Sequence, residues 1–340
     1  MNIKLICHVK NSFEYLPSFL AYHEDLFDEI HIIDQCSDKD LRGLNNKNSH
    51  IFFYKTAYSF FNAMIATTAI LEFKNIRHNS DFIFILDIDE FLPFAQRTSF
   101  EHFLKEHNKN DAIRFQWCNG LHFLPEGKED FFLHESSDVR FFNKKSTTSK
   151  LAYNSHKTPW FLPLHGNHNA KFHFAKFALL RKRSQISESY LPLYHIPFTS
   201  KKNLIEKVKN FDKDEFLEKI INRHQITKNI FQRLTNNEAT EDDLSFFAAN
   251  YRTIGREEVI EAHAGHFQKK MFFQGLQEKI SHWISHLNEC TEVKTHPSPD
   301  THKDQALKVL GKKTVGGRFF LYQLIKKNIF IDVENVIRFK

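Results

Sequence analysis

Two aspartates and a glutamate stand directly after a continuous apolar run. The run is Phe82-Ile83-Phe84-Ile85-Leu86, and Asp87, Asp89 and Glu90 follow it. Such a run is typical of a strand buried on both faces, and two carboxylates one residue apart can reach one hard cation. Mg²⁺ and Mn²⁺ prefer oxygen ligands, and a bound ion neutralises the charge that develops on a diphosphate leaving group. The spacing therefore predicts a metal-dependent transfer site, whereas in the simpler alternative these aspartates only cap a turn.

Strand-like and helical segments alternate around this motif. The expected strands are Ile3–Val9, Glu29–Asp34, Ile51–Tyr54 and Phe82–Asp87, and the expected helices are Glu14–His23 and Ala57–Phe73. This alternation predicts an α/β fold with a mostly parallel sheet covered on both faces. Ligands bind outside the carboxyl ends of the strands in such sheets, which is where Asp87, Asp89 and Glu90 fall.

The rest of the chain predicts a loop-rich segment and then helices. We expect a helix from Phe100 to about His107, a strand at Ala112–Cys118 and an acidic active-site loop at Gly120–Asp138. A Lys-rich, mainly helical region begins near Ser200, and Thr291–Lys303 resembles a flexible connector. We therefore divide the chain into a catalytic domain, residues 1–210, and a C-terminal helical extension, residues 211–340.

Composition narrows the class of protein. Of the 340 residues, 41% are hydrophobic and 26% charged, as in a packed globular protein. The net charge of +6 arises from 47 basic and 41 acidic residues that are interspersed, so we expect no nucleic-acid partner. The four cysteines form no zinc or disulfide pattern, and no apolar run could span a bilayer, which together favour a cytoplasmic protein.

Several motifs together resemble the family-2-like glycosyltransferases. Asp87-Ile88-Asp89-Glu90-Phe91 matches the DxDEF signature of that family. The other matching segments, in the order expected, are Lys10-Asn11 with Glu14, Tyr22-His23, Asp34 with Ser37-Asp38, and Tyr194-His195 with Ser200 and Lys207. One departure is Thr199, where the family usually has an arginine. The resemblance covers roughly the first 210 residues.

The resemblance implies a GT-A fold, a nucleotide-sugar donor such as a UDP-hexose, and Mn²⁺ or Mg²⁺. Asp34 would contact the nucleoside, with Asn11 and Glu14 in the loop beside it. Asp87 and Asp89 would hold the metal and the donor, and Glu90 would support them. The remaining positions that it implies for the metal or diphosphate are His195 and Lys207.

Inversion at the anomeric carbon, which is typical of the family, requires a carboxylate as general base. The expected loop offers several, and we favour Glu135 and Asp138 because they precede the strand-like Val139–Phe142. Trp117, Trp160 and His122 could form an apolar platform for a sugar ring, although core packing is the simpler interpretation of Trp117. Other candidates for acceptor or phosphate contacts are Lys150, His165 and His168.

The function that we expect is hexosyl transfer to an oligosaccharide or glycolipid in bacterial surface polysaccharide synthesis (lipooligosaccharide, capsule or O-antigen). The basic C-terminal residues, among them Lys312-Lys313 and Lys326-Lys327, could contact the inner membrane peripherally, or simply belong to a helical cap. Two alternatives remain. A nucleotidyltransferase of sugar activation also pairs carboxylates with a metal, but Cys7–Ser12 lacks the glycines of its usual phosphate loop. A non-catalytic carbohydrate-binding protein could share the fold.

Overall fold

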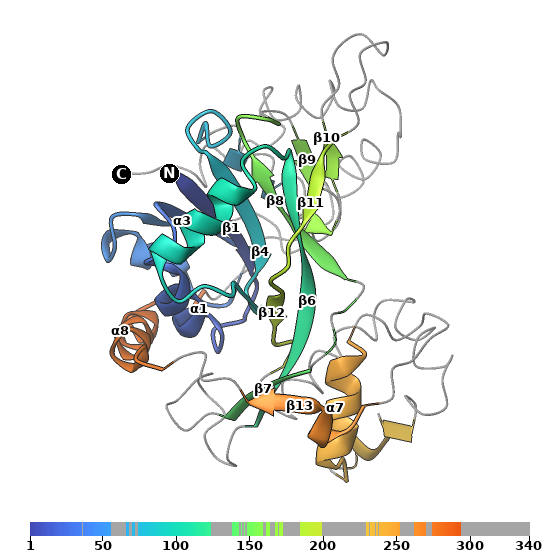
Figure 1. Ribbon diagram of the computed structural model, residues 1–340. Coiled ribbons are helices and arrows are strands. Elements are labelled where there is room, and N and C mark those ends of the chain that lie inside the picture. The colour runs from blue at the N-terminus through green and yellow to red at the C-terminus, as the bar shows by residue number, and fades with distance from the viewer. Residues whose placement is uncertain are drawn as a thin grey trace, which may run out of the picture.

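The fold is a mixed α/β structure built on one large sheet (Figure 1). The computed structural model describes residues 1–35, 37–55, 66–67, 70–71, 74–123, 138–142, 144, 146, 148–158, 161–163, 167–168, 170–172, 184–198, 229–230, 232–234, 236, 238–251, 262–269 and 274–293. The strands are β1 (Ile3–Val9), β2 (Glu29–Asp34), β3 (Ile51–Lys55), β4 (Phe82–Asp87), β5 (Glu90–Phe91), β6 (Ala112–Phe123), β7 (Asp138–Phe142), β8 (Ser149–Asn154), β9 (Phe161–Pro163), β10 (Ala170–Phe172), β11 (Ile186–Glu188), β12 (Leu193–His195) and β13 (Phe267–Lys269). The helices are α1 (Leu16–His23), η1 (Leu41–Asn46), α3 (Arg97–Glu106), α7 (Glu241–Ala249), η4 (Ala264–His266) and α8 (Gln277–Asn288).

The sheet has a parallel half and a mixed half. Strands β3, β2, β1 and β4 run parallel in that order. Strand β8 then pairs antiparallel with β4 and with β6, so β6 again runs in the direction of β4. Strands β11 and β12 pair parallel with β6, and β7 and β13 extend the sheet. The predicted fold class, a mostly parallel sheet flanked by helices in keeping with a GT-A type, is confirmed.

The sheet separates two apolar layers. Side chains alternate between the faces of a strand, and Phe84 and Leu86 of β4 lie in one layer with residues of α1, α3 and α8. Ile83 and Ile85 lie in the other layer, where Ile70 and Leu71 cover them. Strand β4 is therefore buried on both faces, as its apolar run predicts. Only residues 66–67 and 70–71 of the predicted helix Ala57–Phe73 are described with a helical backbone.

Two predicted boundaries were wrong. The predicted loop Gly120–Asp138 begins as strand, because β6 continues to Phe123 and pairs there with β7. Gly120 fits this position because a Cβ atom would lie 2.7 Å from Cε1 of Phe141, closer than packed atoms approach. The helix expected from Phe100 begins earlier, at Arg97.

Parts of the C-terminal half pack on the N-terminal half. Helix α8 lies against α1 (Figure 1), and the buried Trp283 donates from Nε1 to Glu24 Oε2 over 3.0 Å. Directly after α8, the predicted flexible connector proves ordered at its start. Asp40 N donates to Thr291 O (2.9 Å) and Val293 N donates to Asp38 O (2.7 Å). The predicted domain boundary near residue 210 lies outside the described residues.

Helix α7 covers the far end of β6. Phe246 and Phe247 of α7 share a separate apolar cluster with Leu121 of β6, Phe142 of β7 and Phe267 of β13. The helix begins with a capping box between Thr240 and Asp243. Within the part of the chain that the structure describes, no helix is both long and apolar enough to cross a bilayer.

His23 makes folding stability depend on pH. It is fully buried at the end of α1, stacks on Phe91 at 5.7 Å between ring centroids, and donates from Nδ1 to Phe19 O over 2.9 Å. Burial lowers its pKa from 6.5 to about 3, although the bond to Phe19 opposes this shift. In the unfolded chain His23 therefore binds a proton as pH falls through about 6.5, whereas in the folded chain it stays neutral until pH approaches about 3. Stability attributable to His23 is present above pH 6.5 and is lost as pH falls toward 3.

We expect the free energy of unfolding, measured in urea, to fall between pH 6.5 and 5 by about 2 kcal/mol on account of His23, at about 1.4 kcal/mol per pH unit. The variant His23→Phe should show a loss smaller by that amount. The control is His102→Gln, at an exposed position on α3, which should keep the wild-type pH dependence. An undiminished loss in His23→Phe would contradict this assignment.

Candidate active site

The carboxyl edge of the parallel strands gathers the predicted polar residues. Asp87 ends β4 and pairs in register with His8 of β1, whose next residue, Val9, pairs with Asp34 at the end of β2. Adjacent strands lie about 4.8 Å apart, which places Asp34 and Asp87 about 10 Å apart along this edge. The structure therefore brings these two predicted residues to one edge of the sheet, although their registers with Val9 and His8 place them on opposite faces.

Lys150 joins the carboxylates of the motif. Its ammonium group lies 2.6 Å from Asp87 Oδ2 and 3.4 Å from Glu90 Oε2. The Lys150 side chain is 1% exposed and that of Glu90 0%, whereas that of Asp87 is 36% exposed. Burial acts to lower the pKa of Lys150, but Asp87 and Glu90 outweigh it and raise the pKa overall. Lys150 is therefore a buried, protonated side chain that contacts two carboxylates of the motif.

Glu90 is fully buried beside Lys150. Its Oε2 accepts a hydrogen bond of 2.7 Å from Asp87 N, which closes the turn between β4 and β5. Burial raises the pKa of Glu90 well above its ordinary value, and Lys150 opposes that effect. Glu90 Oε1 is buried and has no hydrogen-bond partner among the described residues. The hydrogen bond from Asp87 N to Glu90 and the ion pair of Asp87 with Lys150 thus stabilise the turn that carries Asp89.

His195 reaches the motif through backbone pairing. Strand β12 lies between β5 and β6, with His195 opposite Glu90 and Asn119, and Ile196 N donates to Asp89 O over 2.9 Å. Nε2 of the His195 ring lies 3.7 Å from Asp89 Oδ2. Two residues 106 positions apart in the sequence therefore face each other beside the turn.

The other side of the His195 ring faces β6. Its Nδ1 lies 2.9 Å from Asn119 Oδ1, and its ring stacks on Trp117 with centroids 3.8 Å apart. Asn119 Nδ2 donates to Ala249 O, at the end of α7, over 3.3 Å. Sequence reasoning missed Asn119. The available signal was its position two residues beyond Trp117, which places the Asn119 amide on the same face of β6 as that side chain.

The loops after β1 and β2 are bonded to each other. Asn11, with a left-handed backbone (φ 50°), exchanges hydrogen bonds of 2.9 and 2.8 Å with Asp38 and donates from its backbone to Ser37 Oγ. Asp34 Oδ1 accepts from Ser37 N over 2.8 Å, and burial raises the pKa of Asp34. The half-buried Glu14 lies between this loop and α1. These residues form one connected edge, and their role in nucleoside binding stays a prediction.

The remaining candidate residues do not gather at one place: two are buried in the core, two lie on or beside strands of the sheet, and the others lie outside the described residues. Trp117 and His122 are 1% and 3% exposed and lie in the core, so they offer no open platform to a sugar ring. His168 Nδ1 contacts Ser149 O at 2.8 Å, on the strand that carries Lys150. Asp138 begins β7 opposite Phe123. The candidates that lie outside the described residues are Glu135, Trp160, His165 and Lys207.

The fit to a divalent ion is partial. Among the described residues, no three His, Cys, Asp or Glu side chains are arranged to hold a metal ion. Of the three predicted ligands, Asp87 is bound by Lys150, while Asp89 and His195 face each other. Mg²⁺ sites in enzymes commonly use one or two protein ligands and complete the shell with water and substrate phosphates. Asp89 and His195, with side chains 12% and 2% exposed, are therefore two residues that could contribute to holding such an ion.

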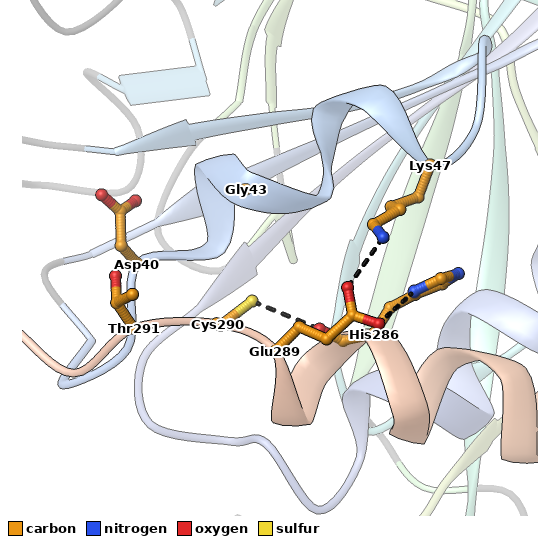
Figure 2. A pocket seen from close by; sticks show the side chains of 7 residues that line it. All are labelled: Asp40, Gly43, Lys47, His286, Glu289, Cys290 and Thr291. Atoms are coloured by element: carbon orange, nitrogen blue, oxygen red, sulfur yellow. Dashed lines mark hydrogen bonds and ion pairs between the residues drawn. The ribbon is translucent and has the colours of Figure 1, made fainter.

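A separate cavity of about 240 Å³ lies between η1 and the end of α8 (Figure 2). Lys47 Nζ contacts Glu289 Oε2 across it at 2.7 Å, and His286 Nδ1 lies 3.5 Å from Glu289 Oε1. Glu289 thus pairs with both Lys47 and His286, whereas Asp40 pairs with Arg42, which does not line the cavity. None of its lining residues belongs to the cluster around Asp87.

Comparisons with known proteins do not assign a family. No protein-family model matches the chain, and no curated protein matches it. One solved structure that matches is the crystal structure of 4-diphosphocytidyl-2C-methyl-D-erythritol synthase, with 12% identity and a TM-score of 0.27, over 46% of this chain and 77% of that chain. So low a likeness carries no argument about activity, and the fold class follows from the sheet topology.

Removal of the Lys150 charge should destabilise the protein. Loss of one partner from a buried ion pair typically costs about 3–5 kcal/mol, so we expect Lys150→Met to lower the free energy of unfolding by that order in urea titrations. Adding Glu90→Gln to Lys150→Met should recover part of the loss, because one uncompensated carboxylate is then removed. The exposed Lys105→Met is the control, and a wild-type unfolding midpoint for Lys150→Met would refute the interpretation.

Proposed function

We propose that the chain is a glycosyltransferase that moves a hexose from a nucleoside diphosphate sugar, such as a UDP-sugar, to a saccharide acceptor. One observation carries the proposal. Asp87, Asp89 and Glu90 stand at the carboxyl edge of a parallel sheet, beside His195 and next to the connected loops of Asn11 and Asp34. A phosphate-bearing nucleotide placed at this edge would meet both a cation site and the loops after the first two strands.

In this proposal Asp89 and His195 hold Mn²⁺ or Mg²⁺ together with the diphosphate. The bound ion supplies a Lewis acid that neutralises charge on the departing nucleoside diphosphate. Asp87 keeps one carboxylate oxygen bound to Lys150 and is partly exposed, so it can accept a hydrogen bond from the ribose or the diphosphate. Glu90 supports the turn from inside, and Lys207 contributes to diphosphate binding.

The loops after β1 and β2 provide the nucleoside contacts, and a carboxylate further along the chain provides the general base. Asp34 binds the nucleoside, with Asn11 and Glu14 beside it. Inverting transfer requires a carboxylate that takes the proton of the acceptor hydroxyl, and we assign this role to Glu135 or Asp138. The acceptor class is an oligosaccharide or glycolipid of a bacterial surface polysaccharide, modified in the cytoplasm or at the inner membrane.

Calorimetry with nucleotides tests the donor site. We expect one of UDP, GDP and CMP to bind in the presence of Mn²⁺ and to lose affinity in EDTA. Replacement of residues that merely support a metal ligand costs about 10–100-fold in affinity, so Asp89→Asn should weaken metal-dependent binding by at least about 10-fold. The control Asp25→Asn, at a side chain that is 75% exposed, should bind as wild type does. Failure of all three nucleotides to bind would refute the proposal.

The alternative activity is separated by the product. Once the preferred base is known, the matching nucleotide sugar should release UDP or GDP in a Mn²⁺-dependent reaction, whereas a CMP-sugar would release CMP and would replace the diphosphate donor of the proposal. Release of pyrophosphate from the nucleoside triphosphate and a sugar phosphate would instead identify a nucleotidyltransferase. Binding without either product would favour a non-catalytic binding protein.

A further inference from the structure

The geometry points to Asn119 as a positioning residue for His195. We infer that Asn119, itself oriented by the carbonyl group of Ala249, selects the His195 tautomer whose Nε2 lone pair faces the cation site beside Asp89. The benefit to cation binding rests on the proposed function. The tautomer itself is a property of the metal-free protein and can be tested without any ligand.

The carbonyl of Ala249 fixes the orientation of the Asn119 amide. Ala249 is the last residue of α7, and the last four carbonyl groups of a helix lack intrahelical partners. A carbonyl oxygen can only accept, so the Asn119 group that lies 3.3 Å from it must be the NH₂ group, Nδ2. The amide oxygen Oδ1 then points away from α7, toward His195.

This orientation decides which ring nitrogen of His195 carries the proton. Asn119 Oδ1 is an acceptor, so Nδ1 of His195, 2.9 Å away, must donate. A neutral imidazole carries one N–H, and its other nitrogen is an acceptor or a metal ligand. In the neutral ring Nε2 therefore keeps its lone pair, and it is the nitrogen that lies 3.7 Å from Asp89 Oδ2. The opposite tautomer would direct a proton at the cation.

Packing holds the ring in this orientation. Both His195 and Asn119 are 2% exposed. Trp117 stacks on one face of the imidazole with an interplanar angle of 18°, and the Tyr251 ring lies 5.2 Å away. Partners of this kind fix the tautomer and the direction of metal-binding histidines, and their loss costs about 10–100-fold in metal affinity.

Through Asn119, α7 acts on the site without contributing a ligand. Ala249 is the last residue of this helix and accepts a hydrogen bond from Asn119, and Tyr251, two residues further on, packs beside the His195 ring. Its N-terminal end is fixed by the Thr240–Asp243 capping box. A residue from the C-terminal third of the chain thus sets the direction of a predicted cation ligand on β12, near the middle of the chain.

A matched pair of variants separates positioning from stability. Asn119→Leu and Asn119→Asp both remove the NH₂ group that bonds Ala249, so both should lose stability. Only Asn119→Asp keeps an oxygen that can accept the Nδ1 proton. Asn119→Ala repeats the apolar test with a smaller side chain, in case leucine is not accommodated. Circular dichroism confirms that each variant is folded.

The first readout is the imidazole ¹⁵N spectrum of the metal-free full-length protein. The His195 signal is assigned among the 21 histidines by its disappearance in His195→Gln. We expect a protonated Nδ1 in wild type and in Asn119→Asp, and a protonated Nε2 or a tautomer mixture in Asn119→Leu and Asn119→Ala. The second readout is Mn²⁺ affinity by calorimetry, which should fall about 10–100-fold in the apolar variants only.

Two results would overturn the inference. One is an unchanged His195 tautomer in folded Asn119→Leu or Asn119→Ala. The other is an equal loss of Mn²⁺ affinity in Asn119→Asp and Asn119→Leu, since the bond to Ala249 would then be the whole role of Asn119. If wild type binds no Mn²⁺ even in the presence of UDP, GDP or CMP, the proposed cation site fails, and the ¹⁵N spectrum alone decides the positioning role.

Discussion

The candidate site depends on the buried ammonium group of Lys150. Three carboxylates within four residues, one of them fully buried, would repel one another strongly at a sheet edge. Lys150 lies within 3.4 Å of two of them and offsets part of that repulsion. The antiparallel register of β8 against β4, with Asn154 opposite Phe82 and Ala152 opposite Phe84, brings Lys150 to the end of β4. The turn that directs Asp89 toward His195 follows from this arrangement.

Strand β6 assembles the rest of the site. Its first part pairs with the strand that carries Lys150, its middle pairs with the strand that carries His195, and its end pairs with β7. One twelve-residue strand thereby positions the ammonium group of Lys150, the imidazole of His195 and the Asn119 amide that orients this imidazole. Its hydrogen-bond register leaves little freedom in the spacing of these groups.

The features that could be predicted from the sequence are those that a local pattern of residues determines. The apolar run before Asp87 specified a buried strand and a polar edge, and the alternation of elements specified a parallel sheet. Asn119 was missed because its role depends on Ala249, 130 residues away, and no local pattern encodes that contact. The binding of Asp87 by Lys150 was missed for the same reason. The extent of β6 was underestimated because Gly120 usually signals a loop, whereas here it makes room for Phe141.

The hydrogen bonds that join Asp38 and Asp40 to Thr291 and Val293 bear on how the protein is made. The loop after β2 leaves the ribosome early, but its backbone partners are among the last described residues to be synthesised. A nascent chain that has completed the parallel strands still lacks this support for the loop, and it also lacks α8 over α1. The carboxyl edge of the parallel strands therefore acquires its last described contacts late in translation, and a prematurely terminated chain would carry the carboxylate motif without them.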